Sequence, residues 1–284
     1  GIRHFCLSRG LGDVYKRQRE QDDMASLTGK KAFVSGGTRG IGLAIAARLA
    51  RDGADVMIAG SSPDNCEAAT QAIALQSDSR VMAHATDLRT PEGCQAAFDA
   101  HSRAFGGCDI LVHSAGATRG GVCPGQDDAD FIDGFALKFH AGVRLARLFW
   151  PSLVAAHGTV VMIVGGASRT PDAKFMVGGA VNAALANFSK ALAGQGLEDD
   201  VNVNWINPGQ TETERLQQLL ATRARDESRS IDDVRAERMQ AEGIRRLGQP
   251  ADTAALVAFL CGDEARHIHG AGIAVDGGAT KGYF

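Results

Sequence analysis

Residues 35–42 read Ser-Gly-Gly-Thr-Arg-Gly-Ile-Gly, and this stretch decides the fold. Residues 31–35, which lead into it, form a short apolar strand, while the residues after it repeat apolar side chains at helical spacing. Gly36, Gly40 and Gly42 allow a sharp turn and a close approach of the backbone to a ligand. The helix that follows offers unpaired N–H groups and the positive end of its dipole to a phosphate. A strand, a glycine loop and a helix in this order predict a dinucleotide site rather than a merely structural turn.

The rest of the chain alternates strands and helices. Strands are expected at 31–35, 54–59, 81–85, 109–114, 159–164, 201–206 and 272–275, and helices at 63–76, 91–105, 130–156, 179–194, 213–242 and 251–260. This alternation predicts a Rossmann-type doubly wound α/β fold, with a mainly parallel seven-stranded sheet and helices on both faces. Residues 1–23 are irregular and are interpreted as a disordered leader or a sequence artefact. Residues 24–284 are expected to form one domain.

Composition excludes several classes of protein. The net charge of −3 does not suggest a nucleic-acid-binding protein, which would be basic. No apolar run is long enough for a membrane helix. The six cysteines form no C-x-x-C pair, so they indicate reduced thiols in a cytoplasmic protein rather than a zinc site. His267 and His269 have no acid or cysteine cluster beside them, and no metal site is predicted.

The glycine loop resembles the cofactor loop of the short-chain dehydrogenases/reductases. Further landmarks agree in order: Asp87-Leu88 after the third strand, His113-Ser114-Ala115-Gly116 after the fourth, Asn207-Pro208-Gly209 with Thr211 and Thr213 after the sixth, and Asp276-Gly277-Gly278 near the end. The resemblance covers residues 30–280 and implies a nicotinamide dinucleotide. The residues expected to bind it are Gly36, Thr38, Arg39, Gly40, Ile41, Gly42, Ser61, Ser62, Asp87, Leu88, Ser114, Ala115, Gly116, Asn182, Pro208, Gly209, Thr211 and Thr213.

The end of the second strand bears on the choice of cofactor. A carboxylate there would accept hydrogen bonds from the ribose hydroxyls of NAD(H). This chain has Gly60, Ser61 and Ser62 instead, and Arg39 in the glycine loop can meet a 2′-phosphate. NADP(H) is therefore favoured over NAD(H), although Arg39 can also be read as a solvated surface charge.

The resemblance also implies a catalytic set of asparagine, serine, tyrosine and lysine, and all four positions are changed. With Ala183 and its neighbours as the anchor of the alignment, the tyrosine position is Gly178 and the lysine position is Asn182. The serine position is Gly165, and the helix asparagine falls near Phe139. The only tyrosines are Tyr15, in the leader, and Tyr283, at the C-terminus.

Other groups near the expected pocket can carry a proton or hold the ribose. Lys138 is a candidate acid or base, with a surface lysine as the alternative. His113 is a second candidate, with a hydrogen-bonded buttress of its turn as the alternative. Asn182 can still bind ribose as a neutral amide. His140, Lys174 and Ser168 are weaker candidates.

Two functions follow. The first is an atypical NADP(H)-dependent oxidoreductase acting on a small or medium carbonyl or alcohol, with a non-standard proton donor. The second is a dinucleotide-binding protein without redox activity: a sensor, a regulatory subunit, or a lyase or dehydratase. Residues 211–245 are a candidate substrate lid. The resemblance implies a homodimer or homotetramer, and four aromatic residues are candidates for its interface or for the core: Phe139, Phe149, Trp150 and Phe188.

Overall fold

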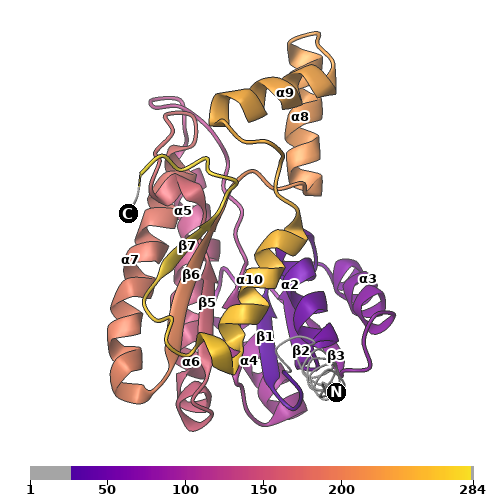
Figure 1. The fold of residues 1–284 in the computed structure, drawn as a ribbon, viewed down its shortest axis with the longest axis vertical. Helices are drawn as coiled ribbons and strands as arrows, with labels where there is room; N and C mark the ends of the chain where they lie inside the picture. Colours follow the sequence, from indigo (N-terminus) through magenta and orange to yellow (C-terminus); the bar gives the residue numbers. More distant parts are fainter. Residues whose placement is uncertain (1–26, 283–284) are drawn as a thin grey trace, which may run out of the picture.

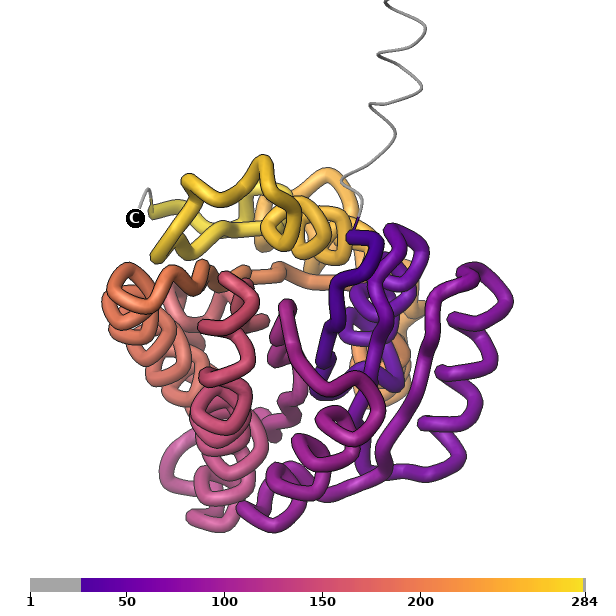
Figure 2. The backbone as a smooth tube through the Cα atoms, turned by 90° about the horizontal axis from the view of Figure 1, so that it is seen from below, coloured from indigo at the N-terminus to yellow at the C-terminus, as the bar shows by residue number. Residues whose placement is uncertain are grey.

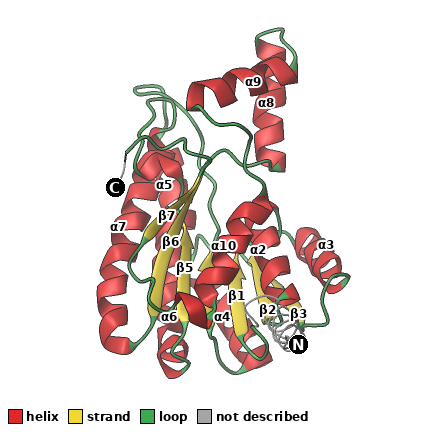
Figure 3. Cartoon of the chain, in the orientation of Figure 1, coloured by secondary structure: helices red, strands yellow, loops and turns green. Residues whose placement is uncertain are grey.

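The computed structural model describes residues 27–282, and these contain a seven-stranded, fully parallel sheet (Figures 1 and 3). The predicted fold is confirmed. The strand order is β3-β2-β1-β4-β5-β6-β7, so the order reverses between β1 and β4. The strands are β1 (Lys31–Ser35), β2 (Asp55–Gly60), β3 (Val81–Ala85), β4 (Ile110–His113), β5 (Thr159–Ile163), β6 (Asn202–Pro208) and β7 (Gly272–Val275).

Helices cover both faces of the sheet (Figure 2). One face buries apolar residues of α2 (Gly40–Arg51), α3 (Pro63–Ala74) and α10 (Pro250–Cys261). The other face packs against α4 (Pro91–Phe105), α6 (Ala141–Ala155) and α7 (Met176–Asp199). Every residue of β4, β5 and β6 is buried, as expected for parallel strands covered on both sides.

The helix expected at 130–156 is not continuous. It consists of α5 (Asp128–Gly134), a π-helical segment, η1 (Phe135–His140), and α6. Within η1 the carbonyl of Lys138 accepts a hydrogen bond from Nε2 of His113, at 2.8 Å. The π-helical turn therefore accepts a hydrogen bond from a buried side chain. Turns of this kind are frequent at functional sites.

The helical stretch expected at 213–242 is also two helices, α8 (Glu214–Asp226) and α9 (Ile231–Glu242). Ser228 has a φ of 52°, which breaks the helix, and Ser230 caps α9 by accepting the Asp233 N–H at 3.0 Å. Both helices stand out from the body beyond the sheet (Figure 1). They share a small apolar cluster of their own: Leu216, Leu220, Ala224, Val234, Ile244 and Leu247.

The predicted leader at residues 1–23, which contains Tyr15, lies outside the described residues, and so does Tyr283. Within 27–282, no helix has both the length and the apolar character needed to cross a membrane. The same residues contain no group of three or more histidine, cysteine, aspartate or glutamate side chains that could hold a metal ion. Of the four aromatic residues, Phe149 is fully buried and belongs to the core, which excludes it from an interface.

Candidate active site

The glycine loop forms a cradle between the ends of β1 and β4. Gly36 has a φ of +67°, and a Cβ added there would lie 2.7 Å from the Cα of Ala115. A Cβ on Gly42 would lie 2.1 Å from the carbonyl oxygen of Gly36. No side chain fits at either position. Since α2 begins at Gly40 without a side-chain cap, its first N–H groups remain for a phosphate, and the cradle fits a dinucleotide.

A hydrogen-bond network holds the turn after β4. Nε2 of His113 donates to the carbonyl of Lys138, so in the neutral ring Nδ1 accepts from Oγ of Ser35, at 2.8 Å. The same Oγ accepts the N–H groups of Ser114, at 3.2 Å, and Ala115, at 3.3 Å. Burial lowers the pKa of His113 from 6.5 to about 4, which keeps the ring neutral at pH 7. The turn that faces the glycine loop is therefore fixed by a buried imidazole.

The second strand ends without a carboxylate at the cradle. Thr38 packs closely on Gly60, where an added Cβ would lie 2.6 Å from its methyl group. Ser62 caps α3, accepting the Asn65 N–H at 3.3 Å. Arg39 is exposed, and its side chain has no ion-pair or hydrogen-bond partner within residues 27–282. A free guanidinium therefore lies at the start of α2, and Ser61 and Ser62 follow the neighbouring parallel strand at the same edge of the sheet.

The remaining cofactor-loop candidates also gather at the carboxyl ends of the strands. Thr213 caps α8, accepting the Leu216 N–H at 3.3 Å, and its methyl group would lie 3.3 Å from a Cβ on Gly40. Gly209 packs so closely on Asp276 that an added Cβ would lie 2.7 Å away. The other candidates from the sequence differ in exposure. Gly116 and Asp87 are exposed, Ile41 is half-buried, and three are buried: Leu88, Pro208 and Thr211.

Gly178 and Gly165 lie against two side chains that occupy the adjacent space. A Cβ on Gly178 would lie 2.0 Å from Cε1 of Phe175, so the phenyl ring lies where a side chain from position 178 would begin. Gly165 has a φ of +130°, and a Cβ there would lie 3.0 Å from Nδ2 of Asn182. Asn182 is buried, and its Oδ1 has no hydrogen-bond partner among the described residues. An acceptor of this kind fits a ligand hydroxyl.

Lys138 reaches the same edge of the sheet from η1. Its Nζ donates to the carbonyl of Val164, directly before Gly165. Its stem lies on Gly116, where a Cβ would meet Cδ at 2.9 Å. Burial and the charge of Arg215 lower the pKa of Lys138 to about 8. A titratable ammonium therefore faces the strand ends next to the glycine that stands at the serine position.

A family model described as enoyl-(acyl carrier protein) reductase matches residues 36–280. The chain belongs to the short-chain dehydrogenase/reductase family. It is 32% identical to the 3-oxoacyl-[acyl-carrier-protein] reductase FabG of Escherichia coli, over 88% of this chain and 97% of that protein. It is 30% identical to the NADPH-dependent reductase BacG of Bacillus subtilis, over 89% and 98%. The L-sorbose reductase of Gluconobacter frateurii, solved with NADPH and L-sorbose, superposes with a TM-score of 0.87 at 30% identity, covering 91% and 99%.

Within this short-chain dehydrogenase/reductase, the assignment of the helix-asparagine position to Phe139 needs correction. The ring of Phe139 packs against Phe135 and Phe188, with centroids 6.0 and 6.2 Å apart, on the side of the helix layer. Lys138 is the neighbour whose side chain reaches the strand ends. The segment is π-helical, and nothing in the apolar periodicity signals this.

His113 offers no free nitrogen to a substrate. The ring is fully buried and both nitrogens are hydrogen-bonded, which corresponds to the buttress rather than the proton donor. His140 is exposed and stacks on Phe139, at 5.4 Å between centroids. Ser168 donates to the carbonyl of Gly165, at 2.9 Å, and also lies 3.2 Å from Oδ1 of Asn207. Of the sequence candidates, Lys138, Ser168 and Asn182 lie around Gly165.

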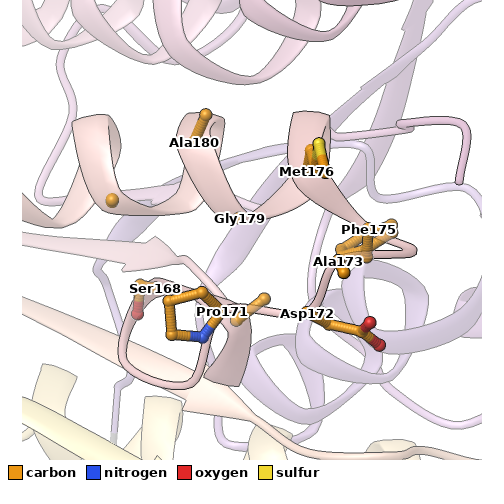
Figure 4. A pocket seen from close by; sticks show the side chains of 10 residues that line it. Ser168, Pro171, Asp172, Ala173, Phe175, Met176, Gly179 and Ala180 are labelled. Carbon is orange, nitrogen blue, oxygen red and sulfur yellow. The ribbon is translucent and has the colours of Figure 1, made fainter. Parts of the chain in front are cut away.

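A cavity of about 420 Å³ lies beside this cluster, between the loop after β5 and α7 (Figure 4). The helix contributes three lining residues: Met176, Gly179 and Ala180. They lie roughly opposite the buried face of α7, which includes Val181 and Leu185. The loop after β5 contributes Ser168 and Phe175 to the lining. The cavity therefore adjoins the residues around Gly165 through Ser168, between the loop after β5 and α7.

Proposed function

We propose that the chain is an NADP(H)-dependent oxidoreductase that acts on a small or medium carbonyl or alcohol, with Lys138 in place of the family's proton-donating tyrosine. Its relatives include an NADPH-dependent reductase and a reductase solved with NADPH, which supports this cofactor. The glycine cradle, the unpartnered Oδ1 of Asn182 and the free guanidinium of Arg39 support the same choice. The observation that carries the proposal is the ammonium of Lys138 beside Gly165.

The proposed chemistry divides between cofactor and protein. When bound, NADPH supplies a hydride to the carbonyl carbon, which forms the new C–H bond and leaves NADP⁺. Lys138 donates a proton from Nζ to the carbonyl oxygen, which forms the O–H bond, and regains a proton from solvent. A pKa near 8 keeps Lys138 mostly protonated at pH 7 and still acidic enough to donate. Asn182 holds a ribose hydroxyl, and the N–H groups at the start of α2 hold phosphate.

The helices α8 and α9, with the segments beside them, form the proposed substrate lid at about 211–245. They stand beyond the carboxyl ends of the strands (Figure 1) and pack through their own apolar cluster. Arg215 of α8 donates to the carbonyl of Thr118, which links the lid to the loop after β4. A cover over this cleft would exclude water from the transfer step.

The test begins with fluorescence titrations of NADPH and NADH, followed by NADPH oxidation with a panel of aldehydes, ketones and oxo acids. We expect NADPH to bind more tightly than NADH, and one substrate class to oxidise it. Lys138→Met should lower the rate of that oxidation at least tenfold without a matching loss of NADPH affinity. Lys174→Met is the matched control, because this exposed loop lysine has no ion pair with the described residues. A larger effect at Lys174 would reassign the donor.

A second function is favoured by the ring of Phe175, which occupies the space at the tyrosine position. A protein in this family that binds the dinucleotide without transferring hydride, such as a sensor or a regulatory subunit, needs no proton donor. Tight NADPH binding with no oxidation by any member of the panel would support this function instead.

A further inference from the structure

Arg215 differs from most arginines of the lid. Arg223, Arg229 and Arg235 each lie within 3.0 Å of a carboxylate oxygen, and Arg225 and Arg238 lie within 4.0 Å of one. Arg215 lies in the first turn of α8 and has no carboxylate within 4.0 Å among residues 27–282. Its guanidinium instead donates through Nη2 to the backbone carbonyl of Thr118. The remaining N–H groups of this guanidinium have no protein acceptor in the described structure.

Lys138 is a second cation at the same loop. Its stem lies on Gly116, two residues before Thr118, and its Nζ donates only to the Val164 carbonyl. It too lacks a carboxylate partner among the described residues. The charge of Arg215 contributes to the lowered pKa of Lys138, so the two positive charges act on each other. Repulsion between two like charges is unfavourable, and an anion bound between them would relieve it.

We propose that Arg215 binds a carboxylate of the substrate, so that the substrate is an oxo acid whose carbonyl faces Lys138. This inference rests on the proposed function, because it assigns the reacting carbonyl to Lys138. A guanidinium matches a carboxylate with two parallel N–H···O bonds, which fixes its orientation. Holding the carboxylate from the lid would place the neighbouring carbonyl at the strand ends. The cradle and Arg39 are the groups that we propose for the phosphates of the cofactor, which leaves Arg215 for the substrate.

The binding test uses malonate, which presents a carboxylate and further oxygens as an oxo acid does but cannot be reduced. Malonate is titrated calorimetrically into the full chain, with and without saturating NADP⁺. We expect binding to the wild type, and a loss of about 10- to 100-fold in malonate affinity in Arg215→Gln. The malonate affinity of Arg215→Lys should fall between those of the wild type and Arg215→Gln. Lysine keeps the positive charge but cannot make two parallel N–H···O bonds to a carboxylate. Arg225→Gln on the same helix is the control: its side chain is 77% exposed and should leave the affinity unchanged.

The outcomes separate this inference from the proposed function. No binding of malonate, or equal affinities in Arg215→Gln and Arg225→Gln, would overturn the inference. If Arg215→Gln weakens NADP⁺ binding by the same factor as malonate binding, the guanidinium serves a cofactor phosphate and the inference is wrong. If malonate binds through Arg215 but NADPH neither binds nor is oxidised by any oxo acid, the proposed function fails while the anion site stands.

Discussion

Acid should destabilise this protein through two buried histidines, His101 and His113. His101 lies among the rings of Phe33, Phe105 and Phe149, with centroids 5.1 to 5.8 Å away, and its Nε2 donates to the carbonyl of Gly107. Burial lowers the pKa of His101 from 6.5 to about 4, and burial does the same for His113. Both rings are almost fully inaccessible, so neither can gain a proton without disturbing the core.

The direction and size of the effect follow from proton linkage. Because the folded pKa lies below the unfolded one, the unfolded chain binds more protons between pH 6.5 and pH 4. The free energy of unfolding therefore falls as the pH falls through that window. With pKa values of about 4 and 6.5, going from pH 7 to pH 4.5 costs about 2 to 3 kcal/mol for each histidine, or about 5 kcal/mol for the two.

Urea unfolding at pH 7 and pH 4.5 measures this difference in each variant. His101→Gln and His113→Gln keep an amide near the position of Nε2 but cannot titrate in this range. Each should remove about 2 to 3 kcal/mol from the pH-dependent loss, whatever its stability at pH 7. His140→Gln, at an exposed position, is the control and should keep the wild-type loss. Wild-type losses in both buried-site variants would refute the reasoning.

Three further predictions concern the site. The rate of carbonyl reduction should fall above about pH 8 as the Lys138 ammonium loses its proton, and Lys138→Met should lack that dependence in NADPH-oxidation assays between pH 6 and pH 10. Gly178→Ala should lower the free energy of unfolding by about 1–3 kcal/mol, because its Cβ meets the ring of Phe175 at 2.0 Å. A double-mutant cycle with Phe175→Ala should recover most of that loss in urea unfolding. Arg39→Glu should weaken NADPH binding by about tenfold or more and leave NADH affinity nearly unchanged, as fluorescence titration would measure.

The fold could be predicted from the sequence because each element had a local signal. Apolar runs fixed the seven strands, and capping residues such as Thr90 and Ser62 accompany helices that begin where expected. The predicted helix boundaries were wrong where tertiary contacts or a single backbone conformation override the apolar periodicity. The π-turn at Lys138 accompanies a hydrogen bond from His113, 25 residues earlier in the chain. The break between α8 and α9 depends on a single residue with positive φ, Ser228.

The site could be predicted only in part, for a related reason. Glycine spacing identified the cradle because its conformational requirement is local. His113 was a candidate proton donor because residue type alone does not show that both nitrogens are used. Arg215 was not singled out, since its distinction is the absence of a carboxylate beside it, which needs the packed structure.

The glycines at the positions aligned with the family's tyrosine and serine each lie against a neighbouring side chain. At Gly178, the ring of Phe175 occupies the space into which a side chain would extend. At Gly165, a φ of +130° disfavours any residue with a Cβ, and the amide of Asn182 already lies 3.0 Å from where that Cβ would be. A tyrosine restored at position 178 alone would therefore have to displace Phe175 before it could reach a substrate. The proton donor that we propose therefore comes from another element: Lys138 reaches this edge of the sheet from η1, the turn that also binds His113.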